Sequence, residues 1–221
     1  MKIDILTIFP NMFTGPFQES ILKRAADKEL VEIAVHNLRD WTTDVHHQVD
    51  DRPFGGGAGM VMMVEPIDKA LEDLKLKAES SKLKTILLSA KGTRYTQQKA
   101  ESLSHIDHLI LVCGHYEGID QRVYEHLVDE VISIGDYVLT GGELPAMVVV
   151  DSIVRLIPGV VGDQESIVDE SHKNPGYIEY PHYTRPATYK GWSVPQILLS
   201  GDHAKINAWR DANSKRVDLS K

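Results

Sequence analysis

Three polar residues, Asp136, Thr140 and Glu143, interrupt an apolar stretch that runs from residue 131 to residue 161. The pattern around them indicates a buried strand, a Gly141-Gly142 turn and a long apolar helix. A strand, a glycine turn and a helix form a common ligand loop in α/β proteins, because glycine lets the backbone approach a ligand closely. An isolated glycine pair is more often only a tight turn, but such a turn has no need of three polar side chains. The stretch therefore predicts a ligand site.

Two further loops are expected beside this one. Ser89-Ala90-Lys91-Gly92 and Gly114-His115-Tyr116-Glu117-Gly118 each follow an apolar strand, as the 135–142 segment does. In a parallel sheet all three lie at the carboxyl edge, where α/β proteins bind ligands. The resulting crevice would have apolar walls and many backbone donors and acceptors, which suits a flat heterocycle such as adenine.

The familiar nucleotide and metal motifs are absent from the sequence. Phe9-Pro10-Asn11-Met12 follows the first strand where a dinucleotide loop would have GxGxxG, and the glycine-rich run from Gly55 to Met60 lacks the lysine of a P-loop. No HExxH or paired CxxC motif occurs, and Cys113 is the single cysteine. We therefore expect no metal ligands and no internal disulfide.

Alternating strands and helices must position these loops. Strands are expected at 2–9, 31–38, 84–90, 108–113 and 131–134, and helices at 12–30, 66–77, 96–103, 119–127 and 143–156. Continuous apolar strands separated by helices predict a parallel sheet that is covered on both faces. After Pro158-Gly159, prolines mark a linker over 162–186, and short helices are expected at 194–199 and 202–210, with Asp202 as N-cap of the second.

The composition is that of a globular protein. The chain has 221 residues, 42% of them hydrophobic, which is enough for one large domain or for a domain with a small appendage. The start, MKIDILTIFP, does not have the pattern of a signal peptide, and no run approaches the roughly 18 apolar residues of a membrane span. We therefore expect a soluble, cytoplasmic protein with no membrane partner.

The charge is unevenly distributed. The net charge of -8 weakly disfavours nucleic-acid binding, but residues 171–221 carry eight Lys/Arg and four Asp/Glu, a balance of +4. A basic tail suggests docking to something anionic, although a solvated helical tail with mixed charges explains the same counts equally well.

Five segments, in the same order along the chain, resemble motifs of the bacterial tRNA (guanine-N1)-methyltransferases, the TrmD family. They are Asp51–Met60, Gly114–Asp120, Ile134–Pro145, Pro181–Pro186 and Leu198–His203. The resemblance covers essentially the whole chain. It implies a SPOUT-type α/β fold, with a parallel sheet, a C-terminal deep trefoil knot and a small helical C-terminal domain. The implied divisions are a methyltransferase domain over 1–161, a linker carrying the catalytic acid over 162–186, and a shortened tRNA-contacting domain over 187–221.

The resemblance also implies a reaction and an assembly. The family transfers a methyl group from S-adenosylmethionine to N1 of guanosine 37 in tRNA, and it works as a homodimer whose active site is shared between subunits. A requirement for magnesium stays open, since nothing in the sequence indicates it. Two alternatives stay open: a related SPOUT enzyme acting on rRNA or on a ribose hydroxyl, and a non-catalytic RNA- or nucleotide-binding module.

The implied chemistry needs a base and a hydrogen-bond donor. N1 of guanine carries a proton, so a carboxylate must remove it while an arginine stabilises the charge that builds on O6. The family has an aspartate 15 residues after the arginine that matches Arg155, and here that position is Glu170, with Asp169 beside it. The resemblance therefore makes Glu170 the first candidate for the base and Asp169 the second, with Arg155 as donor to O6 or to a phosphate.

Cofactor and RNA contacts are carried over from the family motifs in the same way. The expected cofactor residues are Gly114, Ile134, Gly135, Asp136, Tyr137, Val138 and Leu139 at the core, Gly141, Gly142 and Pro145 in the wall, and Leu88, Ser89, Tyr116, Glu117 and Gly118 as neighbours. Glu117 is also a candidate for reading a neighbouring guanine. RNA contact is expected from the loop Arg52–Gly59 and from the basic tail residues Lys205, Arg210, Lys215 and Arg216.

Overall fold

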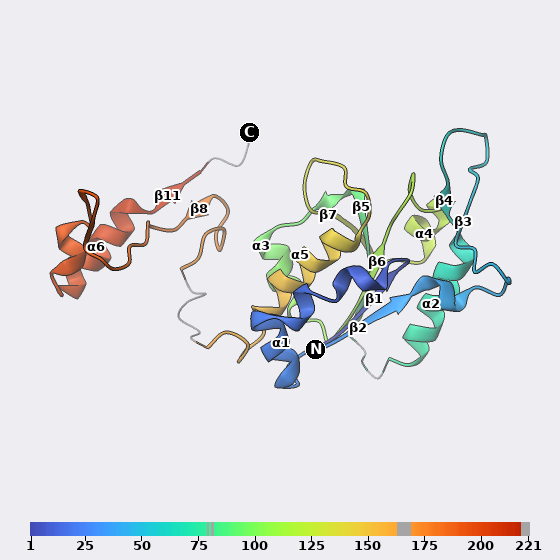
Figure 1. Cartoon of the computed structure of the whole chain (residues 1–221), viewed down its shortest axis with the longest axis horizontal. Helices are drawn as coiled ribbons and strands as arrows, with labels where there is room; N and C mark the ends of the chain where they lie inside the picture. Colours follow the sequence, from blue (N-terminus) through green and yellow to red (C-terminus); the bar gives the residue numbers. More distant parts are fainter. Residues whose placement is uncertain (79, 81, 163–168, 218–221) are drawn as a thin grey trace. The chain divides into compact units, whose positions relative to one another are not determined.

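The structure is a computed structural model that describes residues 1–78, 80, 82–162 and 169–217. The chain divides into two compact units, Met1–Gly162 and Asp163–Lys221 (Figure 1).

A five-stranded sheet forms the centre of the first unit. Its strand order is β2-β1-β6-β5-β7, and every pairing is parallel. The strands are β1 (Lys2–Thr7), β2 (Glu32–Asn37), β5 (Leu83–Arg94), β6 (His108–Cys113) and β7 (Glu130–Ser133). The predicted α/β class and parallel sheet are therefore confirmed.

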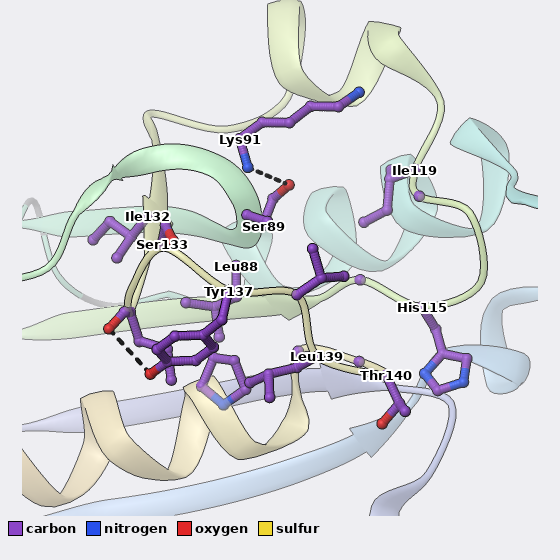
Figure 2. A pocket seen from close by; sticks show the side chains of 18 of the residues that line it. Leu88, Ser89, Lys91, His115, Ile119, Ile132, Ser133, Tyr137, Leu139 and Thr140 are labelled. Atoms are coloured by element: carbon purple, nitrogen blue, oxygen red, sulfur yellow. Dashed lines mark hydrogen bonds between the residues drawn. The ribbon is translucent and has the colours of Figure 1, made fainter.

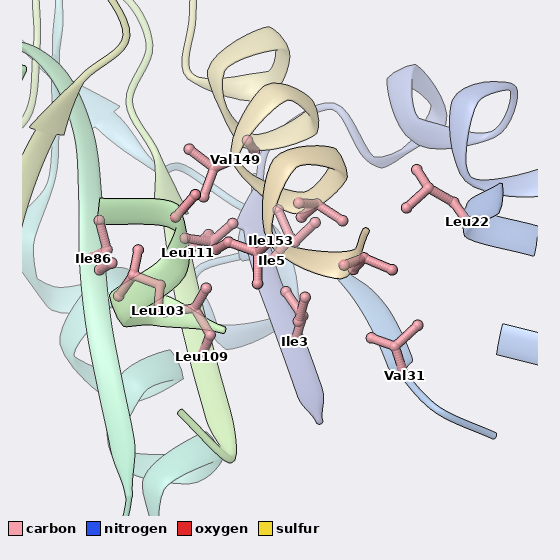
Figure 3. Packing of buried hydrophobic residues seen from close by; sticks show 14 of the residues in the cluster. Ile3, Ile5, Leu22, Val31, Ile86, Leu103, Leu109, Leu111, Val149 and Ile153 are labelled. Carbon is pink, nitrogen blue, oxygen red and sulfur yellow. The ribbon is translucent and has the colours of Figure 1, made fainter. Parts of the chain in front are cut away.

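Helices cover both faces of this sheet (Figure 1). One face carries α1 (Ser20–Asp27), α3 (Gln97–Leu103) and α5 (Glu143–Val154), and the other carries α2 (Val64–Leu76) and α4 (Gln121–His126). Because side chains alternate along a strand, Ile3 and Ile5 of β1 point into the first layer and Leu6 points into the second. Figure 3 shows the first layer, where Ile5 meets Ile153 of α5 in the core.

The predicted helix over residues 12–30 is correct only in its second part. The segment forms two short 3-10 helices, η1 (Pro10–Phe13) and η2 (Pro16–Gln18), and only then α1. The apolar spacing is helical, but Pro16 lacks the N–H that a continuing helix would use, and its ring clashes with the preceding turn. Phe13 and Leu22 still reach the core, although they belong to different elements.

Strand β5 runs past its predicted end at Ala90 and contacts β7 in two stretches. Leu88 pairs with Ile132, and after a shift in register Thr93 pairs with the same residue. Between them, a Cβ on Gly92 would lie only 2.5 Å from the backbone nitrogen of Ile132. Glycine is required there because no side chain fits between the two backbones.

A small hairpin carries the glycine-rich loop. Its strands are β3 (Asp50–Asp51) and β4 (Val61–Met62), and it follows the short helix η3 (Leu38–Trp41). The loop between the strands contains glycines 55, 56, 57 and 59, all with positive φ. This backbone region favours glycine, which explains the composition of the loop.

The second unit is built from short elements. β8 (Tyr177–Ile178) pairs with β11 (Lys215–Arg216), β9 (Thr188–Tyr189) pairs with β10 (Trp192–Ser193), and η5 (Gln196–Leu199) precedes α6 (His203–Asn213). The Asp202 side chain accepts a hydrogen bond from the Lys205 N–H, so the predicted N-cap is confirmed.

Two expectations for this part of the chain, the structureless linker and the helix over 194–199, differ from the structure. Residues 177–178 of the expected linker form a strand paired with the C-terminal end of the unit, a long-range pairing without a local signal. The helix expected over 194–199 is a single 3-10 turn. Residues 163–168 of the linker lie outside the described residues. Among the helices of the described part of the chain, none is long and apolar enough to cross a membrane.

Candidate active site

Residues of β5 and the loops after β6 and β7 meet at one edge of the sheet and line one pocket (Figure 2). The segment 88–91, expected as a loop, is part of β5; the second loop contributes residues 114–119, and the end of β7 with the third loop contributes residues 132–135 and 137–142. Tyr124 of α4 and Pro145 of α5 complete the lining. The three segments that the sequence predicts at one edge of the sheet therefore converge on a single site, although the first of them is strand and not loop.

Backbone contacts hold the second and third loops together. The Gly142 N–H donates to the Gly114 carbonyl at 2.7 Å, and His115 and Gly141 form an isolated antiparallel bridge. A Cβ on Gly142 would lie 2.7 Å from the Cα of Cys113, so any side chain would push the loops apart. The glycine pair thus allows the close backbone packing on which the shape of the pocket depends.

The third loop folds back on itself near its start. The Tyr137 hydroxyl donates to the Ile134 carbonyl at 3.4 Å, and the ring lies where a Cβ on Gly135 would be. This turn directs Asp136 outward, with its side chain 89% exposed and 3.8 Å from the Arg94 guanidinium. The structure therefore leaves Asp136 out of the pocket lining.

The structure gathers the other expected cofactor residues around the pocket. They are Leu88, Ser89, Gly114, Tyr116, Glu117, Gly118, Ile134, Gly135, Tyr137, Val138, Leu139, Gly141, Gly142 and Pro145. Residues that lie 57 positions apart, such as Leu88 and Pro145, come together because three parallel strands end at the same edge.

The pocket also contains residues outside the expected cofactor set: Ala90, Lys91, His115, Ile119, Tyr124, Ile132, Ser133 and Thr140. Most belong to the same three loops, so their position at a strand end was the available signal. Tyr124 had none, because it belongs to α4 and not to a segment at a strand end. Its hydroxyl is 3.1 Å from the Ser89 hydroxyl, and the Lys91 ammonium lies 5.5 Å from its ring centroid.

The chemistry of the lining favours an organic ligand with an aromatic ring. Apart from His115, only Lys91 and Glu117 bring a charge to the wall. The remaining surface combines apolar side chains, loop backbone and the hydroxyl groups of serine, threonine and tyrosine side chains, which can orient a heterocycle through hydrogen bonds. Across the described residues, no group of three or more His, Cys, Asp and Glu side chains is arranged to hold a metal ion.

The glycine-rich hairpin lies directly against the second loop. The Glu117 N–H donates to the Met60 carbonyl at 3.0 Å, and Gly59, with φ of +80°, leaves no room for a side chain beside that of Glu117. Burial and the neighbouring Asp50 carboxylate raise the pKa of the Tyr116 phenol. The end of the glycine-rich loop at Gly59 therefore lies next to one wall of the pocket.

The three predicted catalytic residues lie in different units. Arg155 is the C-cap of α5 in the first unit and is half-buried. Glu170, half-buried, and Asp169, exposed, belong to the second unit. The pairing of the arginine with a carboxylate across the guanine therefore stays a prediction.

The basic tail residues all lie in the second unit. The Lys205 ammonium is 2.9 Å from the Asp202 carboxylate, and the Arg210 guanidinium lies 5.0 Å from the centroid of the Tyr180 ring. Lys215 and Arg216 form the exposed strand β11. Their contact with RNA likewise stays a prediction.

Comparison with known proteins identifies the family. A family model described as tRNA (guanine-1)-methyltransferase TrmD matches residues 1–221. A Dehalococcoides mccartyi protein named tRNA (guanine-N(1)-)-methyltransferase is 54% identical over 221 residues, which cover 100% of this chain and 88% of that protein. Proteins of the same name from Bacillus cereus and Bacillus anthracis are 56% identical over 216 residues, covering 98% of this chain and 88% of each relative. The resemblance carried by the five motifs is thereby confirmed, and the chain belongs to the TrmD family of tRNA (guanine-N1)-methyltransferases.

Proposed function

We propose that this chain transfers a methyl group from S-adenosylmethionine to N1 of guanosine 37 in tRNA, next to the anticodon. Family membership supports the reaction, since the relatives are named for it. The observation that carries the proposal is the pocket, whose second and third loops belong to motifs that match the family. A tRNA substrate also fits the cytoplasmic location expected from the sequence.

The pocket suits the adenosyl part of such a donor. Leu88 and Pro145 bring apolar surface to its walls, and the segment from Ile134 to Leu139 brings backbone donors and acceptors. Bound there, S-adenosylmethionine would supply a methyl group that its sulfonium already activates. The difficult step left to the protein is the preparation of the acceptor nitrogen.

We assign the general base to Glu170, with Asp169 as the alternative, and the stabilisation of O6 to Arg155. Glu170 is half-buried whereas Asp169 is exposed. A partly buried side chain has fewer conformations to lose on reaching its substrate, which favours Glu170. Its extra methylene relative to the expected aspartate requires the backbone to lie slightly farther from the guanine.

A homodimer with a shared active site and a knotted SPOUT arrangement complete the proposal, both on the strength of the resemblance. Helix α5 offers a surface for the dimer. Leu144 and Val148, one turn apart, are 50% and 47% exposed, although the opposite side of the helix is packed into the core. We expect sedimentation at micromolar concentration to give a dimer of the 24.7 kDa chain. A fully active monomer would contradict this.

Primer extension tests the reaction directly, because reverse transcriptase stops at N1-methylguanosine. A tRNA transcript with guanosine 37 should give a stop at that position only when protein and S-adenosylmethionine are both present. A matched transcript with adenosine 37 should give none. Methyl incorporation without a stop would favour the ribose enzyme, and donor binding without incorporation would favour the non-catalytic module.

The base is tested by two amide substitutions. Glu170→Gln should lower the single-turnover rate by roughly two or more orders of magnitude, as expected for loss of a general base, while the Kd for S-adenosylmethionine stays unchanged. Asp169→Asn is the matched control and should have a milder effect. If Asp169→Asn abolishes the reaction and Glu170→Gln does not, the two roles are exchanged. If neither matters, the assignment of the base fails.

A further inference from the structure

Glu143 is a buried carboxylate that the proposed reaction does not use. It is the first residue of α5, it is only 1% exposed, and its Oε1 accepts a hydrogen bond from the Thr7 hydroxyl at 2.7 Å. Removing a carboxylate from water is costly unless its charge is compensated. The N-terminus of a helix supplies part of the compensation, because the helix dipole is positive at that end.

His115 faces the second carboxylate oxygen. Its Nδ1 lies 3.9 Å from Oε2 of Glu143, and this buried nitrogen has no hydrogen-bond partner among the described residues. Gly141 lies between the two groups. A Cβ there would be 2.5 Å from the His115 Nδ1 and would also collide with Oε2 of Glu143. The carboxylate and the imidazole therefore both lie where a side chain on Gly141 would be.

The remaining contacts join this cluster to three elements. The Thr7 hydroxyl, which donates to Glu143, also accepts from the Phe9 N–H at 2.9 Å. The Phe9 ring meets the His115 ring edge to face, with 4.9 Å between centroids. Cys113, the other titratable neighbour, is buried, and burial together with the Glu143 charge raises the pKa of its thiol. The cluster thus joins the end of β1 to the loops after β6 and β7.

The second half of the third loop is held where Gly141 and Gly142 contact the second loop through their backbones, next to the Glu143 carboxylate. At its start, the Ser133 hydroxyl donates to the Gly135 carbonyl at 2.9 Å. Farther along, Val138 is 86% exposed and Leu139 is 38% exposed, and both line the pocket. The position of this wall therefore depends on how firmly the loop is held at Gly141, next to the buried carboxylate.

We propose that Glu143 is a positioning residue for the methyl-donor pocket. Held by Thr7 and facing His115 across Gly141, its carboxylate fixes the end of the loop that forms the pocket wall. The identity of the ligand rests on the proposed function. Figure 2 shows His115 and Tyr137 at opposite ends of the pocket. The cluster around Glu143 therefore supports the third loop at the end of the pocket that is distant from Tyr137.

Two substitutions separate the hydrogen bond from the charge. Thr7→Val removes the donor to Glu143 with little change of shape, and Glu143→Gln keeps an acceptor oxygen but removes the charge. A hydrogen bond to a charged group is strong enough that each change should raise the Kd for S-adenosylmethionine on the order of tenfold. The KM for the donor should rise in parallel, while kcat at saturating donor should stay near that of the wild type. Thr7→Ser, which keeps the hydroxyl, should restore the affinity.

Glu130→Gln is the matched control for a loss of stability alone. Glu130 is a partly buried carboxylate at the start of β7, in ion pairs with Lys84 at 2.7 Å and Lys99 at 2.5 Å, and it does not line the pocket. This variant should lower Tm and leave the Kd for the donor unchanged.

The outcomes distinguish the inference from the proposed function. If Thr7→Val lowers Tm as Glu130→Gln does but binds the donor like the wild type, Glu143 is merely structural and the inference is overturned. Should Glu143→Gln fail to fold, the comparison of Thr7→Val with Thr7→Ser decides alone. If the wild-type protein binds no S-adenosylmethionine in calorimetry, the proposed function fails, and the inference falls with it.

Discussion

The substitution Gly142→Ala tests whether close backbone packing shapes the pocket. Gly142 has φ of −83° and ψ of −4°, which alanine can adopt, so backbone strain is not the expected effect. The new Cβ would lie 2.7 Å from the Cα of Cys113 and 2.8 Å from the nitrogen of Gly114. Both are backbone atoms at the end of β6, and rotation of a side chain cannot relieve the contact.

The size of the effect follows from these distances. Ordinary van der Waals contact begins near 3.4 Å, so the two loops must separate by roughly 0.7 Å. Overpacking of this kind costs about 1–3 kcal/mol, and replacing a glycine recovers about 0.4–1 kcal/mol through the unfolded chain. We expect a net loss of about 1–2 kcal/mol, which lowers the melting temperature of a chain of this length by roughly 2–8 °C.

Thermal unfolding and calorimetric titration with S-adenosylmethionine measure the two consequences. Gly142→Ala should lower the melting temperature and weaken donor binding. Gly15→Ala is the matched control, because Gly15 has nearly the same φ, −85°, and no atom within 4 Å of its added Cβ. The control should be as stable as the wild type or slightly more stable. The reasoning is refuted if Gly142→Ala has wild-type stability and affinity.

Two further predictions concern stability in acid and RNA binding. Asp4 is buried and hydrogen-bonded to His36 at 2.6 Å and His108 at 2.5 Å; burial acts to raise its pKa, but these bonds outweigh it and the pKa is lowered. The ionised Asp4 side chain therefore stabilises the fold at pH values above about 3.9, the pKa of aspartate in the unfolded chain. This stabilisation is lost as the pH falls through the lower pKa of Asp4 in the folded protein. In denaturant titrations at pH 7, Asp4→Asn should lower the free energy of unfolding by about 3 kcal/mol. The variant should also lose the part of the pH dependence of stability that comes from Asp4, and an unchanged pH dependence would contradict this role of Asp4. Phe54, fully exposed on the glycine-rich loop, should stack on an unpaired tRNA base, so Phe54→Ala should weaken tRNA binding roughly tenfold in filter assays, whereas the exposed Leu76→Ala should not. Equal effects of the two variants would argue against stacking.

Much of the fold is predictable because its signals are local. The apolar run His108–Cys113 was expected as a buried strand over the same residues that form β6. The three loops were expected together because parallel strands end at one edge, and the pocket lies there. Prediction was wrong over the first part of 12–30, where helical spacing of Phe13 and Leu22 outweighed the proline between them. Both side chains do reach the core, but from separate elements.

Within the site, sequence reasoning found the loops more readily than the direction of single side chains. Asp136 lies inside the cofactor motif, yet the turn around Tyr137 directs it to solvent. Tyr124 reaches the pocket from a helix whose pattern shows only an amphipathic face. Glu143 was noticed as a polar residue in an apolar stretch, but its partner could not be found by spacing, because Thr7 is 136 positions away.

The sequence by itself determined the order of strands and helices, the parallel sheet, the glycine-bearing ligand loops and the family. These depend on hydrophobic periodicity, on the positions of glycines and on the order of the motifs, all of which are properties of the sequence itself. Only the tertiary structure decided that Gly141 lies between Glu143 and His115, and that Thr7 holds the buried carboxylate. Such contacts depend on which backbones approach within a few ångströms after the sheet has formed, and no local pattern encodes that distance.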